Sequence, residues 1–346
     1  MKISREPLLR ALLAAQPACA ARSTKPILAN VLIDDAEIHA TDLEIGIRVT
    51  MPATGLAACV PPDKLIAILR ECGGDEIDAV LGGDTLTIRT ASGRFNLPTA
   101  DPAEFPKVTA EDGEYVQVPD LAAKLKLVTF AADKRESGAR WAVTGTLFDT
   151  SAGKLSLCAT DTKRLALLET GIEFEKSPAA IVPQKATAIL ERIAGPVGIR
   201  LEKQQAVFQS DDSLIVSRLV EGRFPPYDSI LPKKTTIAVF MGRQDLLSAV
   251  RQASILMDAD SSRMEFCFAD GKLTLTASGA ESGLSEVTLN IGCDHDITIA
   301  FDPQYVIQFL RACGEATVEL RMTSAEKPAV LAGGEGYRYL VMPLAG

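Results

Sequence analysis

Hydrophobic and polar positions along the first third of the chain follow a clear order of elements. Leucines at helical spacing predict an amphipathic helix that begins at Ser4, a candidate N-cap, and stops at Pro17. Short alternating runs predict strands, and a Pro-Pro pair followed later by a Gly-Gly pair brackets a second helix. The predicted helix, three strands, helix and hairpin lie at residues 4–16, 31–33, 37–40, 44–50, 61–74, 77–81 and 85–90.

The same order returns twice. The predicted elements are a helix, a hairpin and a second helix, at residues 119–130, 145–149 with 155–160, and from 182 in the middle third, and at 245–257, 264–268 with 273–275, and from 301 in the last third. Asp270-Gly271 is a strong type I′ hairpin signal. Gly93-Arg94-Phe95 is echoed by Gly222-Arg223-Phe224 as a closing motif.

One short motif sets the period. Ala40-Thr41-Asp42 lies 119 residues before Ala159-Thr160-Asp161, and Ala277-Ser278-Gly279 begins 118 residues after Ala159. Because Asp42 and Asp161 recur in separate repeats, we expect them to bond backbone N–H groups in turns rather than to form a catalytic pair. The chain is therefore a threefold repeat.

A repeat of about 120 residues is long enough to hold its own core. We expect three tandem α+β domains, each with two helices packed on antiparallel strands, at residues 1–115, 116–235 and 236–346. Unpaired strand edges are unfavourable, so neighbouring copies are expected to share sheets across their edges.

Charge is distributed unevenly along the chain. The net charge of -9 and the pI near 5.0 argue against a protein that simply coats nucleic acid. The predicted helices, counted over 4–20, 62–72, 119–140, 183–194, 242–258 and 302–314, carry 14 basic and 10 acidic residues, whereas the remainder carries 22 and 35. A surface formed by the helices would therefore be positive, although a solvated helix face explains the same bias.

Targeting and membrane signals are weak. Seven cysteines are scattered without a C-x-x-C pair, which suits buried thiols in a reducing cytoplasm. Arg10 interrupts the apolar N-terminal run, so an amphipathic helix is favoured over a signal peptide. No run approaches the ~18 apolar residues that a membrane span needs. A cytoplasmic protein is expected.

Catalytic chemistry finds little support. His39 and His295 occupy unrelated positions, and Cys293-Asp294-His295-Asp296 lacks a second ligand pair at zinc spacing. The Gly-Gly pairs lack the spacing of nucleotide-binding loops. We expect no enzyme activity, no metal site and no cofactor.

Five motifs in order carry a resemblance. They are Arg22 to Leu32 (RSTKPILANVL), Ala40 to Ile47 (ATDLEIGI), Ala159 to Leu165 (ATDTKRL), Glu221 to Pro225 (EGRFP) and the terminal Val341-Met342-Pro343. Together they span the chain, and it resembles the bacterial DNA polymerase III beta sliding clamps. The resemblance implies a non-catalytic accessory subunit that forms a head-to-tail homodimeric ring around duplex DNA. It would tether the replicative polymerase for processivity in DNA replication and bind without regard to sequence.

The resemblance also implies three functional surfaces. It places Arg22, Arg140 and Trp141 near DNA, and we expect further phosphate contacts from the basic residues Lys124, Lys126, Lys134, Arg135 and Lys185. A hydrophobic cleft between domains 2 and 3 would take linear peptides of the polymerase III alpha subunit, the clamp loader and other polymerases or repair proteins, at Val143, Thr160, Thr162, Arg164, Leu165, Pro225, Ile230, Leu340, Val341, Met342, Pro343 and Leu344. The dimer joint is expected at Arg94, Phe95, Ile255, Leu256 and Glu281.

Two departures from the family pattern bear on the cleft. Thr162 and Lys163 stand where the family usually has Gly and His, and the tail ends in Leu344-Ala345-Gly346 rather than in Met and a basic residue. Partner preference is therefore expected to differ. A diverged clamp paralogue, or a ring scaffold with altered partners, remains the alternative.

Overall fold

The computed structural model describes residues 1–346 except 134–141, 233, 259–261, 281, 294 and 345–346. The chain divides into two compact units, one formed by residues 1–121 with 185–219 and the other by residues 122–184 with 220–346. We call them unit 1 and unit 2. Each contains one eight-stranded and one four-stranded antiparallel sheet.

The described residues contain six α-helices, as the hydrophobic pattern predicts. They are α1 (Arg5–Ala15), α2 (Pro62–Glu71), α3 (Leu121–Lys126), α4 (Gln184–Leu190), α5 (Arg243–Ala253) and α6 (Pro303–Ala312). The middle third differs from expectation: α3 ends at Lys126, and Thr129–Ala131 forms a separate 3-10 turn instead of continuing the helix.

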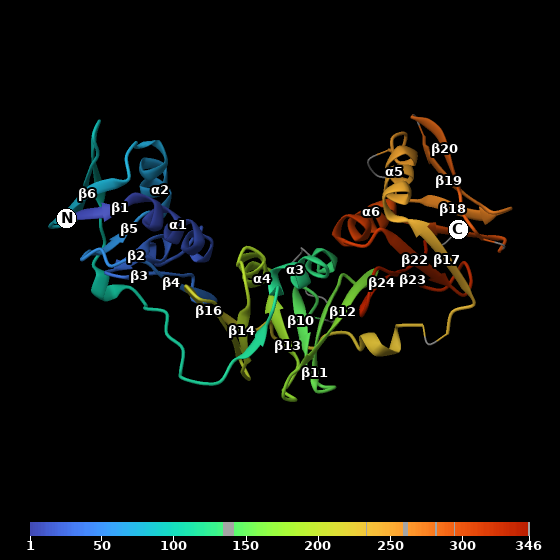
Figure 1. Ribbon diagram of the computed structural model, residues 1–346, viewed down its shortest axis with the longest axis horizontal. Helices are drawn as coiled ribbons and strands as arrows, with labels where there is room; N and C mark the ends of the chain where they lie inside the picture. Colours follow the sequence, from blue (N-terminus) through green and yellow to red (C-terminus); the bar gives the residue numbers. More distant parts are fainter. Residues whose placement is uncertain (134–141, 233, 259–261, 281, 294, 345–346) are drawn as a thin grey trace. The chain divides into compact units, whose positions relative to one another are not determined.

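Unit 1 places its two complete helices together. Helix α1 packs on α2 and on strands β3 and β4 (Figure 1). The four-stranded sheet has the order β1-β6-β7-β8, and the eight-stranded sheet has the order β5-β2-β3-β4-β16-β15-β14-β9. The strands are β1 (Lys2–Ser4), β2 (Val31–Asp34), β3 (Glu37–Thr41), β4 (Ile45–Thr50), β5 (Ala57–Val60), β6 (Glu76–Gly82), β7 (Thr85–Arg89), β8 (Arg94–Pro98), β9 (Val116–Val118), β14 (Val197–Leu201), β15 (Gln205–Gln209) and β16 (Ser213–Arg218).

Unit 2 repeats this plan with α5 packed on α6, β19 and β20. Its sheets have the orders β13-β10-β11-β12-β24-β23-β22-β17 and β20-β19-β18-β21. The strands are β10 (Gly145–Asp149), β11 (Lys154–Thr160), β12 (Arg164–Glu173), β13 (Ala180–Pro183), β17 (Ile237–Gly242), β18 (Met264–Ala269), β19 (Lys272–Gly279), β20 (Gly283–Asn290), β21 (Ile297–Phe301), β22 (Thr317–Met322), β23 (Ala329–Ala332) and β24 (Tyr337–Val341).

Each eight-stranded sheet is made by two consecutive repeats. Strand β4 of the first repeat pairs antiparallel with β16 of the second, and β12 of the second pairs with β24 of the third. The prediction that copies share sheets across their edges is confirmed. Main-chain N–H and C=O groups that would be exposed at four strand edges are paired in this way.

The apolar stripe of α6 shows how a helix is fixed to its sheet. Asp302 caps the helix by accepting a hydrogen bond from the Gln304 N–H (2.8 Å), and Pro303 occupies its first turn. The Phe309 ring stacks against Tyr337 and Tyr339 of β24 at centroid distances of 5.4 and 5.2 Å. Helix α6 is therefore held on the strand that forms the second shared sheet.

Two turn predictions have different outcomes. Asp270 and Gly271 both have positive φ, 49° and 71°, as a type I′ turn requires. The proposed echo between Gly93-Arg94-Phe95 and Gly222-Arg223-Phe224 is wrong, because Arg94 begins β8 whereas residues 222–224 lie beyond the end of β16. The two motifs share letters but occupy different places in the repeat.

Candidate functional site

The Thr-Asp motif forms the same turn in the first two repeats. In the second, Asp161 Oδ1 accepts hydrogen bonds from the N–H groups of Lys163 and Arg164, both at 3.0 Å. Thr160 Oγ1 accepts from the Thr162 N–H (3.0 Å) and donates to the Arg164 carbonyl (2.5 Å). These side-chain bonds replace main-chain pairing in the turn.

In the first repeat the bonds are equivalent. Asp42 Oδ1 accepts from the N–H groups of Glu44 and Ile45 at 2.9 and 2.8 Å. Thr41 Oγ1 accepts from the Leu43 N–H (2.9 Å) and donates to the Ile45 carbonyl (2.8 Å). The predicted turn role of both aspartates is confirmed.

The third copy does not build this turn. Asp258 takes over there, because its carboxylate accepts from the Ala280 N–H at 2.5 Å and from the Ser282 hydroxyl at 2.9 Å. Gly279 lies so close that a Cβ atom would meet Asp258 Oδ1 at 2.6 Å. The sequence here is Ala277-Ser278-Gly279 instead of Ala-Thr-Asp, so the side chains that form the turn in the other repeats are missing.

Arg164 is the main difference between the two equivalent turns. Its side chain is 7% exposed, and its guanidinium donates to Asp161 Oδ2 (3.0 Å), to Gln308 Oε1 of α6 (2.6 Å) and to the Phe130 carbonyl (2.8 Å). It also lies over the Tyr305 ring, 4.4 Å from the centroid. The guanidinium is thus committed to the interior and holds the turn against α6.

A small cavity of about 110 Å³ lies beside this turn, where β12 meets β24. Leu165 and Leu340 form its buried floor, while Ile230 and Met342 reach solvent at its rim. The two leucines belong to a core cluster that also contains Leu147 and Val330. The cavity is lined by Thr160, Thr162, Arg164, Leu165, Pro225, Ile230, Leu340 and Met342.

Eight of the twelve residues expected at the cleft therefore come together. The other four do not line this cavity. Val143 and Val341 are buried, and Val341 pairs with Arg164 inside the shared sheet. Pro343 and Leu344 are half-buried, and the Leu344 N–H bonds the Ala300 carbonyl at 2.9 Å. Alternation along β24 explains the position of Val341, because its side chain points to the opposite face from that of Leu340.

The residues expected at DNA are only partly described. Arg22 and Lys126 are exposed and Lys124 is half-exposed, the two lysines lying in the last turn of α3. The Lys185 ammonium forms an ion pair with Asp42 and bonds the Cys19 carbonyl at 3.4 Å. Lys134, Arg135, Arg140 and Trp141 lie outside the described residues.

The residues expected at the dimer joint occupy two exposed places. Arg94 and Phe95 lie on β8, and Ile255, 73% exposed, follows the end of α5, with Leu256 half-buried beside it. Glu281 lies outside the described residues. Leu284 on β20, which was not among the expected residues, is a further exposed apolar residue of this unit, with 65% of its surface exposed. Its signal was an apolar residue at a position where the strand alternates toward solvent.

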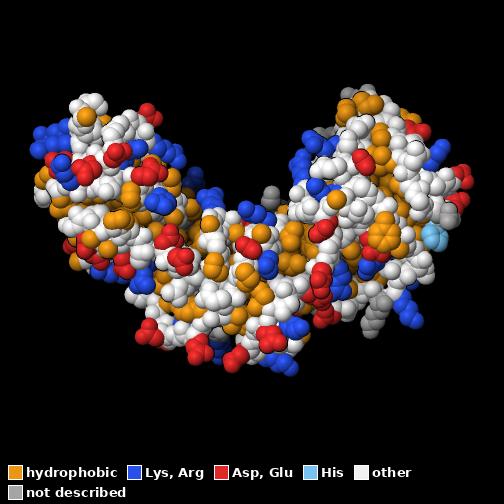
Figure 2. Space-filling view, viewed as in Figure 1, with side chains coloured by type: hydrophobic (Ala, Val, Ile, Leu, Met, Phe, Trp, Pro, Cys, Tyr) orange, Lys and Arg blue, Asp and Glu red, His pale blue; other side chains and the backbone are white. Residues whose placement is uncertain are grey.

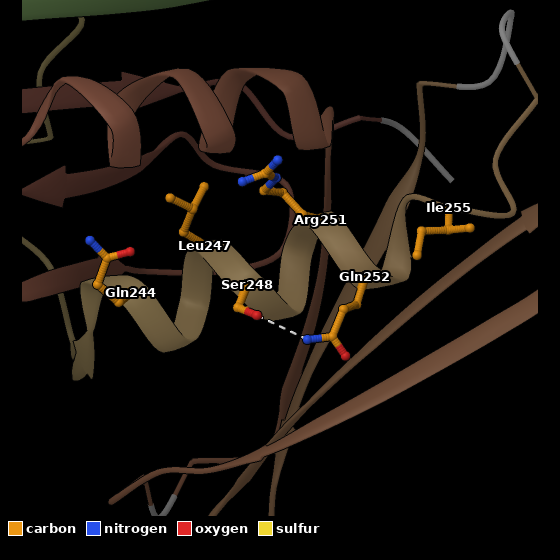
Figure 3. A pocket seen from close by; sticks show the side chains of 6 residues that line it. All are labelled: Gln244, Leu247, Ser248, Arg251, Gln252 and Ile255. Atoms are coloured by element: carbon orange, nitrogen blue, oxygen red, sulfur yellow. Dashed lines mark hydrogen bonds between the residues drawn. The ribbon is translucent and has the colours of Figure 1, made fainter.

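A shallow pocket of about 500 Å³ runs along α5 and ends at Ile255 (Figure 3). Leu247 and Ile255 are its apolar members, and a hydrogen bond of 2.9 Å joins Gln252 to Ser248. In Figure 2, hydrophobic side chains reach the surface over the part of unit 2 that carries α5 and β20. Apolar and polar side chains therefore share this end of unit 2, where Ile255 and Leu284 are the exposed apolar residues.

Three tandem α+β domains, with sheets that continue from one domain into the next, define the DNA-clamp class of protein. Models of the N-terminal, central and C-terminal domains of the DNA polymerase III beta subunit match residues 1–109, 116–226 and 228–345. The chain belongs to the bacterial DNA polymerase III beta subunit family, the beta sliding clamps. This family is an accessory processivity factor of DNA replication rather than a catalytic subunit.

Relatives match along the whole chain. The beta sliding clamp of Salmonella typhimurium is 29% identical, and that of Escherichia coli K12 is 27% identical; each match covers 99% of this chain and 98% of the relative. The sliding clamp of Pseudomonas aeruginosa bound to griselimycin is similar with a TM-score of 0.89 and 26% identity. The Thermotoga maritima beta subunit gives 0.91 and 25%, and both structures are matched over 100% of this chain and 99% of theirs.

Among the described residues, every helix is too short or too polar to span a bilayer. The domain bounds at 115 and 235 stay predictions.

Proposed function

We propose that this chain closes as a head-to-tail homodimer around duplex DNA and docks linear peptides of its partners in the Leu165–Leu340 cleft. The expected partners are the DNA polymerase III alpha subunit, the clamp loader and other polymerases or repair proteins. The observation that carries the docking proposal is the cavity beside the Thr160–Arg164 turn, with buried leucines below and exposed Ile230 and Met342 at its rim.

The chemistry of this cleft suits an apolar peptide side chain. A cavity of about 110 Å³ has room for one aliphatic or aromatic anchor rather than for a large cofactor. Met342 is flexible and polarizable, so it can adapt to anchors of different shape. Its backbone is fixed by the hydrogen bond from its N–H to the Lys163 carbonyl (2.9 Å), so the rim is adaptable while its frame is rigid.

A binding experiment tests the docking proposal. We expect Met342→Ala to weaken a fluorescein-labelled peptide from the polymerase III alpha subunit about 10-fold in Kd, because truncating a central apolar contact costs ~1–2 kcal/mol. Phe240→Ala is the matched control, since Phe240 is 63% exposed on β17 of the same unit and does not line the cavity. Equal binding by Met342→Ala and the unaltered protein would exclude this cleft.

The proposal of ring closure follows from the two shared sheets. In each, the fourth strand of one repeat, β4 or β12, pairs with the last strand of the next repeat, β16 or β24. In the four-stranded sheets, β20 is the fourth strand of the third repeat and β8 is the last strand of the first repeat. Each of them is an edge strand of its sheet. A contact of the same kind between β20 of one copy and β8 of another is heterologous, and it closes if the rotation suits.

The shared sheets also suggest a register. Gly46 pairs with Val216, and Leu165 pairs with Leu340. Leu284 corresponds to Leu165, because Ala277↔Ser285 repeats Ala159↔Ala166. Arg94 and Leu214 correspond to each other, because each is the first paired residue after its hairpin turn, in the pairs Arg89↔Arg94 and Gln209↔Leu214. Two residues further along each strand, Asn96 therefore corresponds to Val216.

Pairing Asn96 with Leu284 then brings complementary groups together. Arg94 would lie opposite Glu286, and opposite charges at paired positions stabilise antiparallel strands. Phe95 would lie opposite Ser285, whose hydroxyl bonds the Ala253 carbonyl of α5 at 2.5 Å. The Phe95 ring would therefore approach Ile255 and the pocket along α5.

Charge reversal tests this register. We expect Arg94→Glu or Glu286→Arg alone to weaken the dimer about 10-fold, and the double variant to recover most of that loss, as measured by sedimentation at nanomolar concentration. Ile255→Ala with Leu256→Ala should weaken the dimer by removing the apolar centre. A dimer insensitive to all of these variants would place the joint elsewhere.

The DNA proposal rests on the family and on the basic bias of the helices. Sequence-blind phosphate contacts permit sliding, and they weaken as salt increases. We expect the clamp, once the clamp-loader ATPase has placed it on DNA, to stay on nicked circular DNA and to be lost after the DNA is linearised. Equal retention on both forms would favour a protein scaffold that does not encircle DNA.

A further inference from the structure

Thr162 has an unusual backbone for its residue type. Its φ is 75°, and among the described residues it is the only β-branched residue with positive φ. The left-handed region is disfavoured for such residues by about 1–3 kcal/mol, and glycine is the residue that occupies it without cost. An outlier of this kind persists only where its surroundings enforce it.

The surroundings of Thr162 do enforce it. Asp161 holds the two N–H groups that follow, Thr160 holds the N–H of Thr162 itself, and Arg164 fixes Asp161 from the interior. The Lys163 carbonyl accepts the Met342 N–H, which ties the turn to β24. Thr162 cannot relax by a local change of backbone without breaking these bonds.

Thr162 is also the polar exception in the cleft lining. The Thr160 hydroxyl and the Arg164 guanidinium line the cleft, but both are engaged in the hydrogen bonds given above. Leu165, Pro225, Ile230, Leu340 and Met342 contribute apolar atoms. The Thr162 side chain is exposed, and its hydroxyl makes no hydrogen bond to any described residue. It is therefore free to bond a ligand.

The equivalent turn of unit 1 provides a contrast. Leu43 has the same backbone, with φ of 77°, but carries no hydroxyl. The cavity beside it, about 210 Å³, is lined by Leu43, Gly46, Val108 and Arg218 among others. A Cβ atom on Gly46 would meet Val108 Cγ2 at 2.8 Å, so Val108 of the chain itself packs where the second turn presents Leu165.

We propose that Thr162 is a specificity-determining residue of the docking cleft: its hydroxyl bonds a carboxylate or amide side chain that adjoins the apolar anchor of the peptide. The nearby Lys163 ammonium forms no ion pair with a described residue and favours the carboxylate. The partners selected are linear peptides with an acidic or amide residue beside an aliphatic or aromatic one. This inference rests on the proposed docking function.

A coupling experiment tests it. The probe is the polymerase III alpha peptide used above, together with variants in which each residue outside the anchor is replaced by alanine. With the unaltered clamp, we expect the alanine replacement of one acidic or amide peptide residue to raise the Kd about 3–10-fold, which is the effect of losing one net hydrogen bond. With Thr162→Val, which keeps the shape and the branched Cβ, that cost should fall below about 2-fold while the other positions are unchanged.

Two glycine variants separate specificity from strain. Thr162→Gly and Leu43→Gly should both raise Tm by relieving positive φ, but only Thr162→Gly should reduce the sensitivity to the polar peptide residue. If Met342→Ala weakens the peptide and Thr162→Val leaves every sensitivity unchanged, this inference fails and the docking cleft stands. If Met342→Ala has no effect, the docking proposal itself fails.

Discussion

The turn at Thr41–Ile45 in unit 1 and the turn at Thr160–Arg164 in unit 2 have one hydrogen-bonded frame and two different surfaces. In both, a threonine hydroxyl and an aspartate carboxylate hold the backbone, and the residue after the aspartate has positive φ. The side chains around the frame differ: Ile45, Gly46 and Arg218 correspond to Arg164, Leu165 and Met342.

The comparison separates the residues that form the turn from the residues that form the apolar cleft beside it. The frame needs only Thr and Asp, which is why Ala-Thr-Asp marked the period in the sequence. The apolar cleft needs Leu165 and Met342, and the first turn has neither. The apolar cleft that we propose for docking therefore depends on the side chains beside the turn and not on the turn itself.

The largest effect should come from removing the two aspartates. Asp161→Ala exposes two unpaired N–H groups and leaves the buried Arg164 guanidinium without its carboxylate, so we expect a loss of about 3–5 kcal/mol in unfolding free energy. Asp42→Ala removes the N–H bonds of the first turn and the partner of the exposed Lys185, and should cost about 1–3 kcal/mol. Urea denaturation followed by circular dichroism measures both, and equal losses would contradict the role given to Arg164.

Exchanging the floor residues should have the next largest effect. Leu165→Ala leaves a void in the core cluster and should cost about 2–4 kcal/mol. Gly46→Ala must displace Val108 and should cost about 1–3 kcal/mol by overpacking.

The two losses are distinguishable by their consequence for function. Only Leu165→Ala should weaken the alpha-subunit peptide, whereas Gly46→Ala should leave its Kd unchanged. Peptide binding that responds equally to both variants would mean that the first turn also docks peptides.

A smaller difference concerns pH. His39 of β3 occupies the place that Cys158 holds in β11; it is buried, its Nδ1 accepts the Val108 N–H at 3.2 Å, and its Nε2 faces Glu37 at 3.2 Å. Burial lowers the pKa of His39, while Glu37 and Asp34 oppose and Arg48 reinforces that shift. The folded state therefore resists protonation that the unfolded chain accepts below about pH 6.5.

Stability should accordingly fall as pH decreases from about 6.5 toward the lower pKa of the folded protein, by at most ~1.4 kcal/mol per pH unit from this group. His39→Cys, which installs the residue of the second repeat, should flatten that part of the profile. Tm measured between pH 5 and 8 gives the difference. A parallel profile for the variant would show that other groups set the pH dependence.

The smallest expected effect is that of Arg218→Met, which gives the first turn the rim residue of the second. Arg218 is exposed and its ion pair with Glu44 spans 3.7 Å, so stability should change by less than about 0.5 kcal/mol. Because Val108 still fills the floor, no peptide binding should be gained at this turn. Isothermal titration calorimetry on Arg218→Met combined with Met342→Ala checks this.

The sequence predicted much of this molecule because its signals are local. Hydrophobic spacing predicted six helices, and the repeated Asp predicted the turns. The short α3 was mispredicted, since Leu125, Val128 and Ala131 are apolar at helical spacing yet the chain leaves the helix after Lys126. Tertiary packing overrides a pattern of this kind.

Other features depend on distant residues. Arg164 reaches Phe130 and Gln308, which lie 34 and 144 positions away, so its burial could not be read from its own neighbourhood. Val341 and Met342 were both expected in the cleft, but the strand register divides them between two faces. The positive φ of Thr162 likewise could not be predicted from its residue type, because the hydrogen bonds of the folded turn impose it.

The open edges of β8 and β20 have a mechanical consequence. Two of the sheet junctions lie within one polypeptide, so after any fluctuation chain connectivity returns their strands to each other at high effective concentration. A junction between copies has no such return. If β8 and β20 close the ring as proposed, separation of these strands is the step at which the ring opens, and whatever opens it must shield two bare strand edges for as long as DNA is entering.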